Sequence, residues 1–85
     1  METPQKHIDE NNTMIEIFKD LVAEIDKEID ELVALELEFG IQNPDLLRVK
    51  ASYRSYYQYM IGALKTSNKR CESYLERSDQ DCISL

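Results

Sequence analysis

Apolar residues recur along the first half of the chain at alternating spacings of three and four, the period of one face of an α-helix. They are Ile15, Phe18, Val22, Ile25, Ile29, Leu32 and Phe39, and the stripe is interrupted only at Glu36. Before this stripe, Thr13 and Glu16 have the spacing of a capping box, in which each side chain satisfies a backbone N–H that the helix start leaves unpaired. After it, Gly40 provides the left-handed residue that commonly closes a helix. The pattern predicts a helix from about Met14 to Phe39.

A second helix is predicted after a connection of about four residues. Asn43 suits the N-cap, Pro44 is tolerated at the first helical position, and Asp45 faces the positive end of the helix dipole. The apolar stripe that follows consists of Leu46, Val49, Tyr53, Tyr57, Met60, Leu64, Cys71 and Tyr74. Helical spacing continues to about Arg77. Gly62 costs about 1 kcal/mol relative to Ala inside a helix, so it marks a candidate kink or close helix contact.

Two long helices joined by a short connection must fold back on each other, which predicts an all-α, antiparallel helical hairpin. The hairpin is expected over residues 14–77, with a flexible N-terminal segment at 1–13 and a flexible acidic tail at 78–85. A rod of two helices has one line of contact and leaves apolar residues in water. We therefore expect a second copy or a helical partner protein to complete a four-helix bundle. The competing architecture breaks the second helix at Gly62 and folds as a three-helix monomer.

The two stripes also indicate which residues pack and which face a partner. The expected packed seam consists of Leu21, Ile25, Ile29, Leu32, Tyr53, Tyr57, Met60 and Leu64. Four tyrosines lie between Ser52 and Met60 and spread around more than half of the helix, so they cannot all face one core. Tyrosine and arginine are enriched at interface hot spots. Arg54, Tyr56 and Tyr59 are therefore the predicted partner contacts.

The net charge and the lengths of the apolar runs disfavour several classes of function. The 85 residues include 17 acidic and 10 basic side chains, for a net charge of -7. This balance disfavours a direct nucleic-acid binder, because Lys and Arg supply most of the affinity for phosphate. No apolar run approaches the roughly 18 residues that span a bilayer, and the first thirteen residues are too polar for a secretory signal, so a cytoplasmic protein is expected. The C-terminal Cys82-Ile83-Ser84-Leu85 has the outline of a prenylation box, but Ser84 departs from its aliphatic position and the preceding residues are acidic.

The sequence contains few residues whose type and spacing suit catalysis or metal binding. Four carboxylates on the first helix recur at steps of four, namely Glu16, Asp20, Glu24 and Glu28. A carboxylate-bridged metal pair also needs Glu-x-x-His motifs, and the only histidine, His7, lies outside the predicted helix, so a solvated acidic face is expected. Cys71 and Cys82 have the spacing of neither a zinc site nor a disulfide framework. We expect no catalytic, cofactor or metal site and no enzymatic activity.

The segment Gly40-Ile41-Gln42-Asn43-Pro44-Asp45-Leu46-Leu47 resembles the turn of the Spo0E-like sporulation phosphatases, which are small helical hairpins that act on a phosphorylated response regulator. The resemblance covers about 20 residues, and the Ser and Asp of that family's signature are replaced at Lys50 and Arg54. The layout is also similar to the hairpin co-chaperones of type III secretion. The sequence predicts a small acidic interaction protein, acting as adaptor, chaperone or inhibitor through helix packing. A phosphatase-like regulator and an acidic DNA mimic remain as alternatives.

Overall fold

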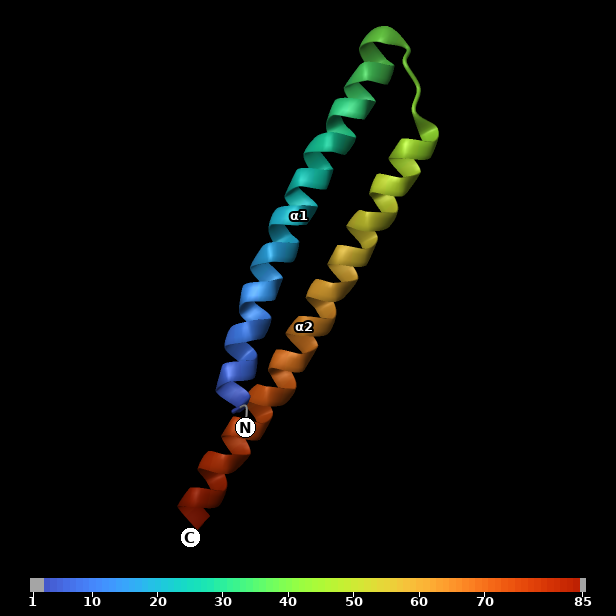
Figure 1. Cartoon of the computed structure of the whole chain (residues 1–85). Coiled ribbons are helices and arrows are strands. Elements are labelled where there is room, and N and C mark those ends of the chain that lie inside the picture. Colours follow the sequence, from blue (N-terminus) through green and yellow to red (C-terminus); the bar gives the residue numbers. More distant parts are fainter. Residues whose placement is uncertain (1–2, 85) are drawn as a thin grey trace.

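The chain forms two long helices that lie antiparallel, side by side (Figure 1). In the computed structural model, the backbone is described for residues 3–84 and the side chains for residues 3–77. Helix α1 covers Pro4–Phe39 and helix α2 covers Pro44–Ser84, and residues 40–43 connect them at one end of the molecule. The predicted all-α helical hairpin is confirmed. Because α2 runs through Gly62 without a break, the three-helix alternative is wrong.

The hairpin is a rod rather than a globule. Its extents are 71 × 19 × 14 Å and its radius of gyration is 19.7 Å. A compact domain of this length has a radius of gyration of about 12 Å. Helix length alone accounts for the difference, since the 36 residues of α1 rise about 54 Å at 1.5 Å per residue.

Helix α1 begins at Pro4, so the predicted start at Met14 is wrong. The hydroxyl of Thr3 accepts a hydrogen bond of 3.1 Å from the backbone N–H of Lys6, and Pro4 occupies the first helical position. Thr13 therefore lies inside the helix, where its hydroxyl donates to the carbonyl oxygen of Asp9 at 3.1 Å. Two start signals compete in this sequence, and the upstream one begins the helix because Ile8 can extend the buried stripe. Residues 4–13, expected as a flexible segment, belong to α1.

Helix α2 also extends past its predicted end at Arg77. Its backbone continues through residues 78–84, which were expected as a flexible acidic tail, so that the end of α2 projects beyond the start of α1 (Figure 1). The side chains of this extension are outside the described part of the structure. The thiol of Cys82, the expected site of the prenylation-like motif, is among them.

The turn lies at residues 40–43, where the sequence predicts it. Gly40 has a left-handed φ of 68°, and its N–H donates to the carbonyl oxygen of Glu36 at 2.9 Å. The N–H of Ile41 donates to the carbonyl oxygen of Leu35 at 3.3 Å, and the carbonyl oxygen of Asn43 accepts from the N–H of Leu47 at 3.0 Å. These bonds satisfy backbone groups that a helix end leaves unpaired, so both sides of the turn are fixed locally.

Gly62→Ala is expected to stabilise the hairpin by about 1 kcal/mol, because alanine has a higher helix propensity. A Cβ built at Gly62 meets nothing within 4 Å, so neither a kink nor a close helix contact requires glycine there. Gly40→Ala is the matched control, since it places a side chain in the left-handed region and should cost about 1 kcal/mol. Urea denaturation followed by circular dichroism measures both changes. A loss of stability in Gly62→Ala would contradict the open space seen here.

Little of the hairpin is fully buried. Among the described residues, the buried apolar side chains are Ile8 and Ile15, at 7% and 6% exposure. The rings of Phe18 and Tyr57 meet across the helices with centroids 5.6 Å apart. Two ion pairs, Asp26–Arg54 and Glu28–Lys50, also join α1 to α2. Such partly exposed pairs contribute about 0 to 1 kcal/mol each, so the thin apolar contact provides most of the stability.

Candidate protein-interaction surface

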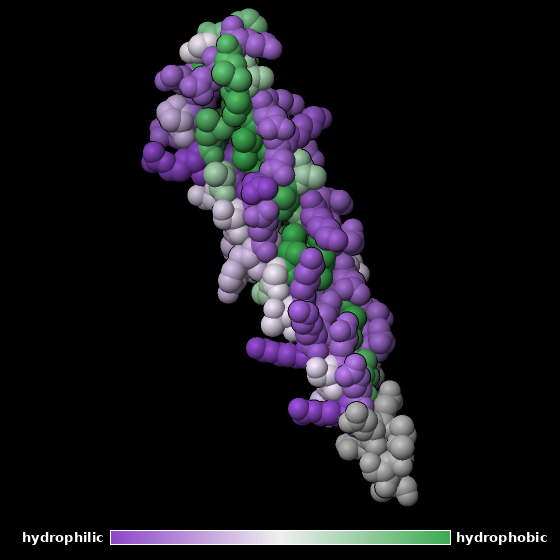
Figure 2. All heavy atoms as spheres, turned by 180° about the vertical axis from the view of Figure 1, so that it is seen from behind, coloured by the Kyte–Doolittle hydropathy of each residue, from purple (hydrophilic) through white to green (hydrophobic). Residues whose placement is uncertain are grey.

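Large apolar side chains reach solvent along most of the hairpin. Those classed as exposed are Met14, Ile17, Leu21, Val33, Leu35, Leu37, Phe39, Ile41, Leu46, Val49, Tyr53, Tyr56, Tyr59 and Tyr74. Seen from one side, hydrophobic surface is most extensive towards the end that carries the loop (Figure 2). Single exposed apolar residues are normal on a monomer, but a contiguous set marks an interaction surface.

One contiguous set lies where the two helices meet. We name it the apolar face, and it consists of Leu21 and Ile25 of α1 and Leu46, Val49, Tyr53 and Tyr57 of α2, which line a single shallow hollow. Helical geometry explains why these residues gather. Residues spaced by three and four share one side of a helix, and the antiparallel pairing brings that side of α1 next to the corresponding side of α2.

Tyrosines extend the apolar face along α2. Tyr53 and Tyr57 stack with ring centroids 6.4 Å apart, and Tyr56 meets Tyr57 edge to face at 5.7 Å. Together with Ser52, these three tyrosines line a second small hollow. Tyr59 is 73% exposed and lies beside Gly62 in a separate depression. Because neighbouring rings hold each other in place, they present a preformed surface that loses little side-chain entropy on binding.

The structure divides the residues of the predicted packed seam between two environments. The half-buried members are Ile25, Ile29, Leu32, Tyr57, Met60 and Leu64. Leu21 and Tyr53 are exposed, and on the apolar face they lie beside the half-buried Ile25 and Tyr57. This division follows from the limited contact between two helices, since residues on the flank of each stripe have no third element to cover them.

The predicted partner contacts are also divided. Tyr56 and Tyr59 are exposed and available. Arg54 is half-buried, and its guanidinium donates from Nε to Asp26 of α1 and from Nη1 to the side-chain oxygen of Gln58 at 3.4 Å. The structure therefore gives Arg54 a role inside the hairpin, and it does not place this side chain with the two exposed tyrosines.

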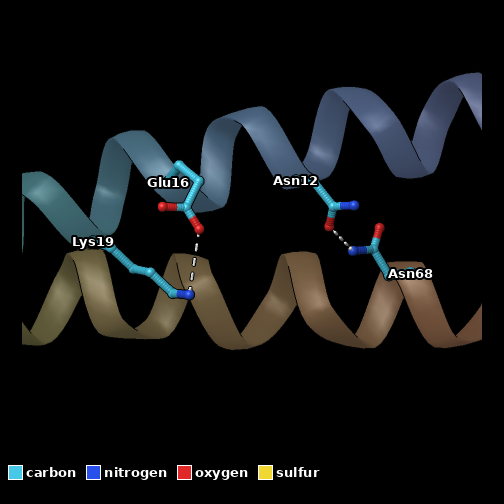
Figure 3. A network of polar contacts seen from close by, with 4 residues as sticks. All are labelled: Asn12, Glu16, Lys19 and Asn68. Carbon is cyan, nitrogen blue, oxygen red and sulfur yellow. Dashed lines mark hydrogen bonds and ion pairs between the residues drawn. The ribbon is translucent and has the colours of Figure 1, made fainter.

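The opposite end of the rod contains a cluster that the sequence pattern does not single out. We name it the polar layer, and it consists of His7, Asn11, Asn12, Ser67 and Asn68. The buried Asn11 amide donates to Asn68 Oδ1 at 2.9 Å and to Ser67 Oγ at 3.2 Å. Asn68 in turn donates to Asn12 Oδ1 at 2.9 Å, and these two side chains point towards each other between the helices (Figure 3).

The rest of the layer continues across the hairpin, since His7 Nε2 lies 3.4 Å from Ser67 Oγ. A signal for the layer does exist in the sequence. Asn11 occupies a stripe position, three residues after Ile8 and four before Ile15, and Asn68 lies four residues after Leu64. A polar residue at such a position in a helix interface fixes register.

The other candidate groups, namely the acidic row of α1 and the cysteines, form no metal site among the described residues. Within them, no three His, Cys, Asp or Glu side chains are grouped so as to hold a metal ion. Glu16 of the acidic row pairs with Lys19 on the same helix at 3.4 Å (Figure 3). Cys71 is a half-buried free thiol. Over its described residues, neither helix has the length and hydrophobicity of a membrane span.

Comparison with protein-family models, curated proteins and solved structures gave no match to this chain.

Proposed function

We propose that this chain is a protein–protein interaction module, which acts as an adaptor, chaperone or inhibitor by packing its helices against a second copy or a helical partner. The observation that supports this proposal is the contiguous apolar face, beside a core in which two apolar side chains of the described residues, Ile8 and Ile15, are buried. Helix-in-groove recognition uses such a surface, because an added helix covers apolar residues that two helices leave in water.

The energetics favour occupation of this face. Removing apolar area from water contributes about 25 cal/mol per Å². Tyr53 and Tyr56 each leave more than half of their surface in solvent, so covering each of them contributes on the order of 1 to 2 kcal/mol. Covering several such residues contributes more free energy than a few surface ion pairs do. Helix packing is therefore the interaction for which this surface is suited.

Replacing Tyr56 and Tyr59 together by Glu tests the proposal. Both side chains are exposed, so the hairpin should keep its circular-dichroism spectrum while its association with other chains, its own copies included, falls at least tenfold, about 1.4 kcal/mol. The measurement is quantitative co-purification of the tagged chain with its bound proteins from the cells that make it. Light scattering of the purified chain measures self-association in parallel.

Tyr74→Glu is the matched control, because it makes the same chemical change at an exposed tyrosine of α2 farther from the loop. This variant should associate like the unchanged chain. If the double variant also kept every association at full strength, tyrosines beside the apolar face would not mediate binding, and the proposal would be contradicted.

A further inference from the structure

The two edges of the apolar face differ in chemistry. Along α1, the carboxylates of Glu24 and Glu28 line the hollow together with the apolar residues. Along α2, the neighbouring side chains are the tyrosines of the second hollow. The apolar face thus has an acidic edge on one side and an aromatic edge on the other, and this asymmetry constrains what covers it.

The basic residues nearest to the acidic edge are already engaged. Lys50 lines the same hollow and pairs with Glu28. Arg54, one turn further along α2, pairs with Asp26. Glu24 has no ion pair within the described residues, and Glu31, two turns further along α1, is exposed as well. The acidic edge therefore carries negative charge that the hairpin leaves uncompensated.

A second copy complements this face poorly. If α1 of one copy lay against α1 of the other, two acidic edges would meet and repel. If α1 lay against α2 instead, the acidic edge would meet the second hollow, whose lining of Ser52 and three tyrosines includes no basic side chain. Each copy also carries a net charge of -7, which adds long-range repulsion between copies.

We infer that the apolar face binds an amphipathic helix of a partner protein that carries Lys or Arg along one flank of its apolar stripe. This inference depends on the proposed function and specifies the partner's chemistry. The apolar stripe of the bound helix would cover Leu21, Val49 and Tyr53. Its basic flank would pair with Glu24 and Glu31, and an arginine above a tyrosine ring adds a cation–π contact.

A designed peptide of about 18 residues, five helical turns, provides the probe. It carries Leu at helical spacing and Arg on both flanks of that stripe, with a fluorophore for anisotropy titration. One reference peptide has Glu in place of every Arg. A second has the same composition with the Leu positions permuted so that no stripe remains. The Arg peptide is expected to bind in the micromolar range and the other two at least tenfold more weakly, with affinity falling as salt is added.

Variants of the chain locate the contact. Glu24→Lys should weaken binding of the Arg peptide about tenfold and strengthen binding of the Glu peptide. Glu10→Lys is the matched control, because it makes the same change at an exposed glutamate of α1 that lies 14 residues before Glu24, a rise of about 21 Å along the helix. It should change either affinity less than about threefold, since exposed charges farther apart than a Debye length are screened.

Several results would overturn the inference. Equal binding of the Arg and Glu peptides would show that charge does not select the partner, although a binding role for the apolar face would stand. Equal effects of Glu24→Lys and Glu10→Lys would mean that net charge, rather than this edge, attracts the peptide. A stable homodimer that excludes the Arg peptide would identify a second copy as the occupant. That outcome would contradict the inference while supporting the proposed interaction module.

Discussion

Ile15→Asp is expected to unfold the hairpin. Ile15 is 6% exposed and is one of the two buried apolar side chains of the described structure. An unpaired carboxylate at this position costs about 3 to 5 kcal/mol. The single core of so small a chain rarely supplies more than about 3 to 5 kcal/mol, and this core has two buried apolar side chains among the described residues, so most of the population should lose its helices. Circular dichroism during heating would show the cooperative transition of the unchanged chain and none in the variant.

Leu37→Asp provides the control for this prediction. It makes an equivalent aliphatic-to-aspartate change in α1, but Leu37 is 81% exposed. Exposed substitutions usually change stability by less than about 0.5 kcal/mol. Both variants are compared at one protein concentration, because association with a second copy would make the melting temperature depend on concentration. If Ile15→Asp melted like Leu37→Asp, the buried contact between the helices would not hold the hairpin together.

The second large effect is expected in the polar layer. Asn68→Ala removes both the acceptor of the Asn11 amide and the donor to Asn12. Asn11 stays buried with the Ser67 hydroxyl as its other described partner, so the free energy of unfolding should fall by about 1 to 3 kcal/mol. Urea denaturation measures the change. An unchanged midpoint would mean that these hydrogen bonds contribute nothing beyond what water supplies.

Replacing Asn11 and Asn68 together by Leu should restore most of that stability, because no buried polar group is left without its partner. The coupling free energy between the two positions should then lie between about 0.5 and 3 kcal/mol in a double-mutant cycle. Additive effects would show that the two amides act independently.

The doubly substituted hairpin should also lose its unique alignment. Polar residues in a helix interface fix register, whereas leucines pack acceptably in more than one position. Spin labels at the exposed positions Asp9 and Lys69, in a chain whose two cysteines are replaced by serine, measure the separation of the helices. The distance distribution should broaden when the polar layer is replaced. A distribution as narrow as before would mean that the ion pairs and the loop, rather than the polar layer, fix the register.

Signals between near neighbours in the sequence determined the two helices and the turn. Gly40 requires a left-handed conformation, and Asn43 with Pro44 restarts the helix, so the hairpin could be predicted without reference to distant residues. The surplus of apolar surface could also be predicted, because it follows from stripe width and helix number. The start of α1 could not, since Thr3 and Thr13 are both competent caps and the choice depends on whether Ile8 becomes buried.

Contacts between residues far apart in the sequence decided the rest. Asn11 and Asn68 are separated by 57 positions, and their hydrogen bond exists because antiparallel pairing places them at the same level. Because of the same alignment, Tyr53 lies exposed on the apolar face, and Arg54 forms an ion pair with Asp26. Periodicity assigns a residue to a side of its own helix. Which residue of the other helix it meets depends on the axial alignment of the two helices, which is a property of the packed pair.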